Sequence, residues 1–278
     1  MATITAQAVK ELRDLTDLPM MDVKKALVDA DGDQARAIEL LKERNKKVML
    51  KRLENATSEG LIRIATSDDG SVGAMIELQC ESAPVAKADD FVFLADQFAK
   101  QLLVGPGAST SDELLSQPVP DRAGLTLKEL LEDTVGKIRE KMVLARVLRV
   151  TGPVGAYAHH DGKTGVLFQA TGEKKATPVL KDVAMHVAAL KPLVTQPEEL
   201  PAEQVAAERA RLTAEAAASG KPANIVEKIV DGRMKTYFAE SGVLTFQLFA
   251  KDDSKTVSQA LAESGLKAAG FTRWILGN

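Results

Sequence analysis

Residues 60–80 have the sequence GLIRIATSDDGSVGAMIELQC, and this stretch decides the fold class. Two apolar runs, 60–66 and 72–80, flank a polar turn in which Asp69-Gly70 tolerates positive φ angles, so the pattern predicts a β-hairpin. In the second run every other residue, from Val72 to Cys80, is apolar, which predicts one buried face. Helical spacing occurs on both sides of this hairpin. We therefore expect an α+β fold with small antiparallel sheets.

The residues that follow the hairpin complete a first core subdomain, predicted over 53–141. Apolar residues at helical spacing, from Phe91 to Leu102, predict a helix near 88–103 that ends at Gly105-Pro106-Gly107. Thr126 and Glu129 have the spacing of a capping box, which predicts a helix over 127–141.

A second core subdomain is predicted over 142–278. The polar, alanine-rich stretch 197–223 is strongly helical but has a thin apolar face, which favours a helical projection at about 190–225 over a core helix. Ser254 is expected to cap a final helix. Residues 142–150 and 163–170 are expected to be strands of a second small sheet. Helices are expected over 179–191 and about 222–239, and a last strand is expected to end at Leu276. Because hairpin-and-helix patterns occur near 59–103 and 142–191, two related subdomains are plausible.

The first 52 residues have the spacing of three short helices. Thr5 is a candidate N-cap for the first, Pro19 suits the start of the second, and Asp33 caps the third. The basic run 42–52 is expected to end this domain and form a linker. The break between the first two helices carries Met20 and Met21. They either pack the hinge or form an adaptable apolar contact for a protein partner, and the small size of the domain favours contact.

Composition excludes several classes of protein. A net charge of −3 over 278 residues gives no general attraction to nucleic acid or acidic membranes. The single cysteine, Cys80, excludes an intramolecular disulfide and a four-cysteine zinc site. No signal peptide is apparent, and no stretch approaches the roughly 20 apolar residues that span a bilayer. We expect a soluble, cytoplasmic protein.

No motif predicts a catalytic, cofactor or metal site. Neither a phosphate-binding loop nor a dinucleotide fingerprint is present, so the chain is not expected to bind nucleotide. His159 and His160 lie in a predicted turn without further ligands nearby, which favours exposed polarity over metal binding or acid–base chemistry. His186 and Cys80 are expected to be structural groups with at least partial burial. The basic run lacks interleaved aromatic residues, so specific nucleic-acid binding is not expected.

Seven strings in fixed order carry a family resemblance. They are TDLPMMDVKKAL from Thr16, SEGL from Ser58, YAH from Tyr157 with GKTGVL from Gly162, AMHVAA from Ala184, GRMK from Gly232 and SKTV from Ser254. Together they resemble elongation factor Ts, the family of guanine-nucleotide exchange factors for elongation factor Tu. The resemblance covers nearly the whole chain.

The resemblance implies an N-terminal ubiquitin-associated-like head of three helices, a core of two α+β subdomains and a projecting helical hairpin. It implies that the head docks on the nucleotide domain of elongation factor Tu, that the first subdomain reaches toward the magnesium and phosphate site, and that the second contacts another domain. It allows a dimer of heterodimers. His159 would face the phosphate-binding region. The partner-binding residues it implies are Leu12, Met20, Met21, Val23, Lys24, Glu81, Ser82, Ala83, Pro84, Val85, His159 and Met234.

One departure from the family pattern concerns the loop after Cys80. The family usually carries Thr-Asp-Phe-Val after a cysteine–acid pair, and the phenylalanine is a wedge near the nucleotide. Here Cys80-Glu81 is followed by Ser82-Ala83-Pro84-Val85. Pro84 is a smaller wedge, or Phe91 or Phe93 compensates, or other contacts suffice.

The expected function is nucleotide exchange through binding, without catalytic residues, cofactor or metal. A protein-binding adaptor or holdase that does not exchange nucleotide is the alternative. An enzyme with an unrecognised site has less support, because no cluster of titratable residues stands out in the sequence.

Overall fold

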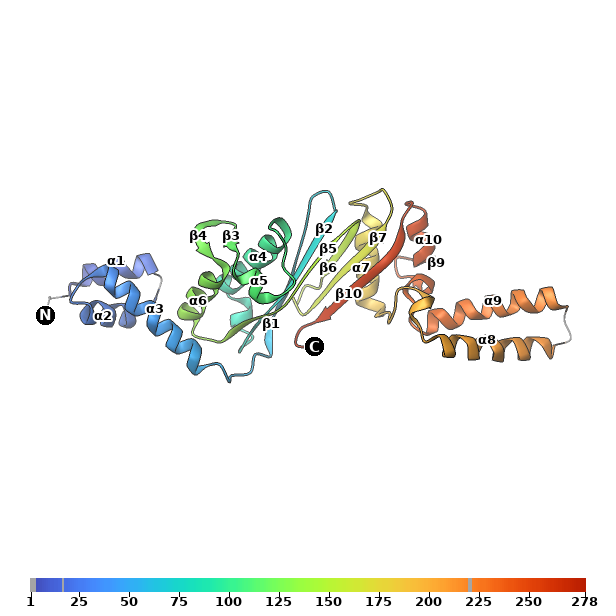
Figure 1. The fold of residues 1–278 in the computed structure, drawn as a ribbon, viewed down its shortest axis with the longest axis horizontal. Coiled ribbons are helices and arrows are strands. Elements are labelled where there is room, and N and C mark those ends of the chain that lie inside the picture. The colour runs from blue at the N-terminus through green and yellow to red at the C-terminus, as the bar shows by residue number, and fades with distance from the viewer. Residues whose placement is uncertain (1–3, 17, 220–221) are drawn as a thin grey trace.

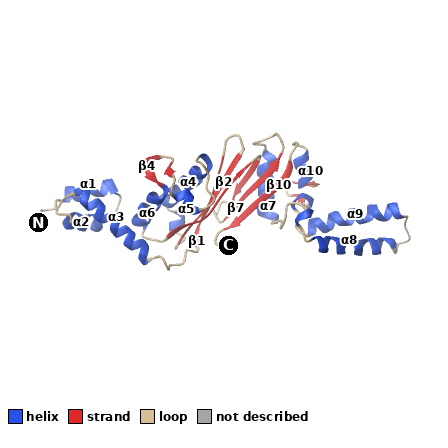
Figure 2. Ribbon diagram, viewed as in Figure 1, coloured by secondary structure: helices blue, strands red, loops and turns tan. Residues whose placement is uncertain are grey.

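The computed structural model describes residues 4–16, 18–219 and 222–278. Figure 1 shows an elongated molecule with three helices at one end, two sheets with their covering helices in the middle, and a helical hairpin at the other end. Figure 2 shows that strands are confined to the middle part, which confirms the α+β class. Asp17, in the predicted break after the first helix, lies outside the described residues.

The N-terminal head consists of α1 (Ala6–Thr16), α2 (Met20–Asp29) and the first part of α3 (Gln34–Lys51). Two predicted caps are confirmed. Thr5 Oγ1 accepts a hydrogen bond from the Ala8 amide at 3.1 Å, and Asp33 Oδ1 accepts one from the Arg36 amide at 3.1 Å. The buried core of the head comprises Val9, Leu12, Leu18, Val23, Ala26, Leu27, Ala30, Ala37 and Leu41.

The predicted linker over 42–52 is wrong, because α3 continues without a break to Lys51. This run contains no glycine or proline and is rich in good helix formers, so nothing ends the helix at residue 42. We call residues 42–51 the stalk. The stalk packs on α6 (Leu127–Ile138), and a Cβ added at Gly136 would lie 2.1 Å from Asn45 Nδ2. An ion pair between Asp22 and Arg139 also joins head and core.

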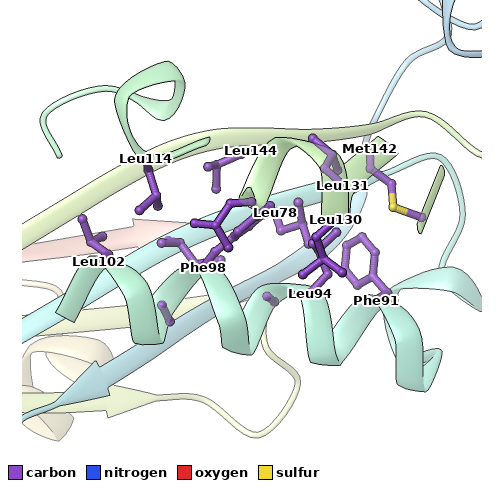
Figure 3. Close-up of a cluster of buried hydrophobic side chains, with 14 of the residues drawn as sticks. Leu78, Phe91, Leu94, Phe98, Leu102, Leu114, Leu130, Leu131, Met142 and Leu144 are labelled. Carbon is purple, nitrogen blue, oxygen red and sulfur yellow. The ribbon is translucent and has the colours of Figure 1, made fainter. Parts of the chain in front are cut away.

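The first half of the core, residues 59–151, is built on an antiparallel sheet of order β1-β2-β5. The predicted hairpin is confirmed as β1 (Glu59–Thr66) and β2 (Val72–Cys80), and the predicted helix as α4 (Asp89–Val104). Figure 3 shows Phe91, Leu94, Phe98 and Leu102 of α4 on the side of that helix that faces the core. The remaining elements are η1 (Val85–Lys87), α5 (Ser111–Leu115), β3 (Pro118–Val119), β4 (Arg122–Thr126) and α6.

Two predictions about the end of this half need correction. The Thr126–Glu129 capping box is confirmed, but α6 ends at Ile138 rather than 141, because Arg139 adopts a left-handed conformation with φ 65°. Residues 142–150, expected in a second sheet, form β5 (Met142–Thr151), which pairs with β2 in the first sheet. On this pairing we propose that the first subdomain extends to Thr151 instead of ending at 141.

The second half, residues 154–275, is built on an antiparallel sheet of order β6-β7-β10. Its strands are β6 (Val154–Ala158), β7 (Thr164–Thr171) and β10 (Lys267–Ile275), and α7 (Pro178–Leu190) packs on them. A short hairpin of β8 (Leu248–Phe249) and β9 (Asp252–Thr256) precedes α10 (Val257–Ala262), and single turns η2 (Pro197–Glu199) and η3 (Leu244–Phe246) flank the inserted hairpin. The predicted cap at Ser254 is wrong: Ser254 lies in β9, and Thr256 caps α10 with Gln259.

The two halves pack against each other through their sheets. Met75 of β2 lies in a shared cluster with Ile62, Val154 and Leu167, while the alternate residues of β2 face α4. The strand is therefore buried on both faces, and the prediction of a single buried face is wrong. Glycine permits the close approach: a Cβ added at Gly165 would lie 2.5 Å from Ile62 Cγ2.

An ion pair within the first half also contacts the second half. Glu77 of β2 is 1 % exposed and pairs with Arg146 of β5. The Arg146 guanidinium lies 4.5 Å from the centre of the Trp274 ring of β10, and the Gly277 amide donates to Glu77 Oε1 at 3.1 Å. The residues after β10 are thus fastened to the first half.

The helical projection consists of α8 (Ala202–Ala217) and α9 (Ala223–Glu240). The predicted extent of about 190–225 therefore stops too early, because the helix predicted at 222–239 is the second arm of the hairpin. The thin apolar face of α8 packs on α9, where Leu212, Ala216, Val230 and Met234 are buried. Within the described residues, no helix combines the length and apolar character that a membrane span requires.

Candidate functional site

Two surface segments implied by the resemblance lie at the same end of the sheets. Glu59, at the start of β1, is paired with Cys80, at the end of β2, so the loop 81–85 leaves the sheet beside Glu59. The turn between β6 and β7, residues 159–163, packs on the same part of β1. The Ile62 amide donates to the Gly162 carbonyl at 2.7 Å, and Lys163 Nζ pairs with Glu59 at 3.0 Å.

The loop after β2 presents two small exposed residues, Ala83 and Pro84, on a fixed base. On one side the Ser82 amide and hydroxyl donate to the Glu140 carboxylate at 3.0 and 2.6 Å. On the other side the single turn η1 follows, and Val85 packs partly against the core. The Cys80 thiol donates to the Ser82 carbonyl at 3.3 Å. The loop is therefore held in one shape before any partner arrives.

Cys80 is a buried structural thiol, as predicted. It is 0 % exposed, and burial raises its pKa to about 11. A thiol that stays protonated at neutral pH is a poor nucleophile and metal ligand.

Glu81 turns inward instead of facing a partner. Its carboxylate accepts hydrogen bonds from Arg52 and Asn55 and from the Lys141 amide, and its side chain is 18 % exposed. Burial alone would raise its pKa, but these three donors outweigh it and hold the pKa of Glu81 below its usual range. Direct partner contact, as the resemblance implied for Glu81, does not fit this environment.

His159 lies in the turn between β6 and β7, as predicted, but it is half-buried rather than exposed. The Tyr157 hydroxyl is 2.9 Å from His159 Nδ1 and orients the ring, while the His160 ring lies beside it at 4.2 Å between ring centres and is tilted by 58°. Nε2 of His159 has no hydrogen-bond partner among the described residues, so it is available to an external acceptor or donor. The described residues contain no cluster of three or more potential metal ligands.

His186 is more deeply buried than predicted. It is 1 % exposed, and the Ala250 amide donates to its Nδ1 at 3.1 Å, so Nε2 carries the proton and donates to Gln247 Oε1 at 2.9 Å. Burial lowers the pKa of His186, and the bond to Gln247 opposes this shift only in part. His186 is thus a neutral structural group.

The head exposes an apolar patch around the break between α1 and α2. Met20 is 54 % exposed and Met21 72 %, and Lys24 is also exposed. Two residues that were not predicted as contacts extend this patch: Leu15, which is 70 % exposed, and Val28, which lies on the outer face of α2. Leu15 follows Leu12 at helical spacing, but α1 ends one residue later and Leu18 fills the adjacent place in the core.

Three other residues implied as contacts lie in hydrophobic interiors. Leu12 and Val23 are core residues of the head, 1 % and 0 % exposed, and Met234 is buried between α8 and α9. Their burial does not fit direct contact in this conformation, although each supports a surface formed by its neighbours.

A cleft of about 290 Å³ separates the head from the first half of the core. Phe93 lines it and carries the Arg122 guanidinium 4.9 Å from its ring centre, whereas Phe91 is 0 % exposed in the core. Phe91 therefore cannot replace an exposed aromatic wedge. The cleft also carries charged and polar side chains from both units: Lys42, Asn45, Asp90, Asp133, Thr134 and Lys137.

Comparison with known proteins shows similarity along the whole chain. A family model described as Elongation factor TS matches residues 81–278. The chain is 42 % identical to elongation factor Ts of Paenarthrobacter aurescens, with both chains covered in full. It is 39 % identical to elongation factor Ts of Polynucleobacter asymbioticus, with 100 % of this chain and 91 % of the relative covered. The protein of the same name from Hyphomonas neptunium is 39 % identical over 100 % of this chain and 93 % of its own.

Proposed function

This chain belongs to the elongation factor Ts family and is a translation elongation factor, and from that premise we propose that it promotes the release of GDP from elongation factor Tu. Elongation factor Tu is its proposed protein partner and the cytoplasm its proposed location. The factor acts by binding and is not an enzyme. It takes no cofactor and does not itself bind nucleotide, membrane or a specific nucleic acid.

The observation that carries this proposal is the shared position of two surface elements, the rigid Ala83-Pro84 loop and the His159 turn, on either side of the start of β1. A preformed loop can push into a partner without losing the binding energy that ordering it would cost. We propose that Met20, Met21 and Lys24 anchor the head on the partner while these two elements act at its nucleotide site.

Nucleotide exchange requires only that the factor bind the nucleotide-free form of its partner more tightly than the GDP-bound form. A GTP-binding protein holds GDP with backbone amides at a helix N-terminus and with a magnesium ion that bridges phosphate oxygens. A factor that binds the nucleotide-free form more tightly lowers the affinity for GDP by the same ratio by which GDP lowers the affinity for the factor. No covalent bond forms or breaks in this step.

Pro84 is the proposed wedge in place of the usual phenylalanine. It is exposed at the tip of the loop, whereas Phe91 is buried and Phe93 faces the cleft. A proline ring is smaller than a phenylalanine ring, but its fixed φ angle stiffens the loop that carries it.

The direct test is a chase experiment. Elongation factor Tu is loaded with a fluorescent GDP analogue and mixed with excess unlabelled GDP, with and without this protein. We expect release to accelerate with increasing factor and then to level off. A stable complex on gel filtration together with unchanged release would contradict exchange and support the alternative, a non-exchanging adaptor. The same column separates a heterodimer from a dimer of heterodimers.

His159 is proposed to act on the phosphate side of the partner. His159→Ala should lower the exchange rate at saturating factor by about tenfold, the equivalent of one lost hydrogen bond, and change complex affinity less. His160→Ala is the matched control, because it changes the neighbouring exposed ring and leaves the Tyr157–His159 bond in place. If His159→Ala weakens docking and leaves the rate within the complex unchanged, the proposed role is wrong.

A further inference from the structure

Glu81 joins three segments that are distant in sequence. Its carboxylate accepts from Arg52 at 2.9 Å through both oxygens, from Asn55 Nδ2 at 2.8 Å, and from the backbone amide of Lys141. Arg52 follows the last residue of the stalk, and Lys141 precedes β5. The Lys141 ammonium extends back and donates to the carbonyls of Leu53 and Asn55 at 2.6 and 2.9 Å. Glu81 and Lys141 together fasten the end of the stalk to the core.

The same carboxylate lies at the base of the exposed loop. Ser82, the next residue, is bound by Glu140 through its amide and its hydroxyl, and Glu140 is the neighbour of Lys141. Two successive residues of the loop base are thus attached to 140–141, and the first of them is also attached to the stalk. Because α3 runs unbroken from the head to Lys51, it forms a continuous helical link from the head to Arg52 and so to Glu81.

Charge makes this junction selective for a carboxylate. Arg52, the Asn55 amide and the Lys141 amide all present donors to Glu81, so a group at this position must accept from every one of them. Bonds between charged partners are shorter and stronger than neutral ones, and Glu81 is 18 % exposed, so water only partly competes with them.

We propose that Glu81 is a positioning residue that couples the orientation of the head to the conformation of the Ala83-Pro84 loop. This inference rests on the proposed exchange function, in which the head anchors the partner and the loop disturbs its nucleotide site. The coupling transmits docking of the head to the loop and fixes the distance between anchor and wedge.

Glu81→Gln is the primary variant, since it places an amide N–H against groups that also donate. Arg52→Gln breaks the same contact from the stalk side, on a residue that is one-third exposed, and serves as the second variant if Glu81→Gln folds poorly. Glu54→Gln is the matched control, because it removes the same charge from an exposed position on the same connecting segment. Circular dichroism and thermal unfolding verify that each variant is folded.

Two measurements are made on each variant. The first separates the affinity for elongation factor Tu from the rate of GDP release at saturating factor. The second is the distance between spin labels on cysteines placed at Lys10 of α1 and Lys128 of α6, measured without partner. Both positions are exposed, and the buried thiol of Cys80 does not compete for the label.

We expect both junction variants to broaden the distance distribution and to lower the saturated rate by about tenfold, with a smaller change in affinity. Glu54→Gln should match the wild type in both measurements. An unchanged distribution, or a broadened one with an unchanged saturated rate, would overturn the coupling. If the wild-type protein itself fails to accelerate release, the proposed function fails, and the distance measurement alone then decides whether Glu81 holds the head.

Discussion

The two halves of the core follow one plan, but the first presents the exposed Ala83-Pro84 loop after its hairpin, whereas the second carries a projecting helical hairpin. In each half a β-hairpin is followed by a helix, a two-stranded hairpin, a capped helix and a third strand. The sheet orders, β1-β2-β5 and β6-β7-β10, are equivalent. This repeat is more extensive than the rough similarity visible in the sequence.

The correspondence extends to individual hydrogen bonds. The first residue of α6 donates to the Gln117 carbonyl at 2.9 Å, and the first residue of α10 donates to the Gln247 carbonyl at 3.0 Å. Each glutamine side chain then bonds to the long helix of its half. Gln117 accepts from Gln101 of α4 at 3.0 Å, and Gln247 accepts from His186 of α7 at 2.9 Å.

The halves differ in their connections. The first half has a compact link between α4 and β3 and presents its loop between β2 and α4, whereas the second half inserts α8 and α9 between α7 and β8. A shared scaffold with different connections is a common route to new binding surfaces, because connections tolerate change better than packed elements. On the proposed function, the contacts with the partner come from the connections, while the repeated elements form the hydrophobic core.

The largest expected effect tests whether the halves unfold together. Phe98→Ala in the first half and Phe168→Ala in the second should each cost about 3–5 kcal/mol, because both rings are fully buried. The stacked sheets predict a single transition in urea for each variant. The chain has one tryptophan, Trp274, in β10 of the second half, where it contacts Arg146 of the first half, so its fluorescence reports on β10 and on the junction between the halves.

Phe98→Ala should therefore shift the Trp274 fluorescence transition by as much as the circular dichroism transition. A Trp274 transition that stays at the wild-type urea concentration would show that the halves are independent units.

A smaller change in the free energy of unfolding is expected when either of the two equivalent polar pairs, Gln101–Gln117 and His186–Gln247, is broken. Gln101→Leu and His186→Leu each leave a half-buried glutamine without its hydrogen bond, at a cost of about 1–2 kcal/mol. Only the second pair titrates. Because the pKa of His186 is lowered in the folded state, the unfolded chain takes up the proton first as the pH falls.

Stability from His186 is therefore complete above the unfolded histidine pKa and decreases as the pH falls below it, by at most about 1.4 kcal/mol per pH unit. Urea unfolding at pH 7.5 and 5.5 should show a smaller pH dependence in His186→Leu than in the wild type, and the wild-type dependence in Gln101→Leu. Equal pH dependence in all three proteins would contradict the proposed difference.

The smallest effect compares the two capping boxes. Thr126→Ala and Thr256→Ala should each cost about 1 kcal/mol, because each hydroxyl accepts from a backbone amide at the start of its helix. Ser254→Ala is the control, since Ser254 bonds only locally to Asp252 and caps no helix. Thermal unfolding that ranked Ser254→Ala with the two caps would show that the second box is incorrectly assigned.

Local sequence patterns predicted most of the helices and strands, but they did not predict which strands that are distant in sequence pair with each other. The hairpin over 60–80, the helix from Phe91 to Leu102 and the cap at Thr126 all follow from spacing and residue type within one element. The pairing of 142–150 with β2 does not, because an aliphatic run carries no information about which strand it will join. The stalk was missed because a basic run was interpreted as the end of a domain, although its residues favour helix.

In the candidate site, too, some features could be predicted from the local sequence and others could not. Exposure of Met20 and Met21 and the turn at His159 could be predicted from neighbouring residues. The inward orientation of Glu81 could not, because its partners Arg52 and Lys141 lie 29 and 60 positions away in sequence. A carboxylate beside an exposed loop has the same sequence pattern whether it faces a partner or an arginine.

The bond from Gly277 to Glu77 spans 200 positions in sequence and so determines an order of events during synthesis. The strands and helices of the first half are made early, and Arg146 is available to Glu77 soon after. The Gly277 amide, which donates the last of the hydrogen bonds to Glu77, does not exist until residue 277 has been added. A nascent chain thus carries the Glu77 carboxylate without its last donor while the whole second half is being translated, and the arrival of β10 completes a structure that began to form at the other end of the message.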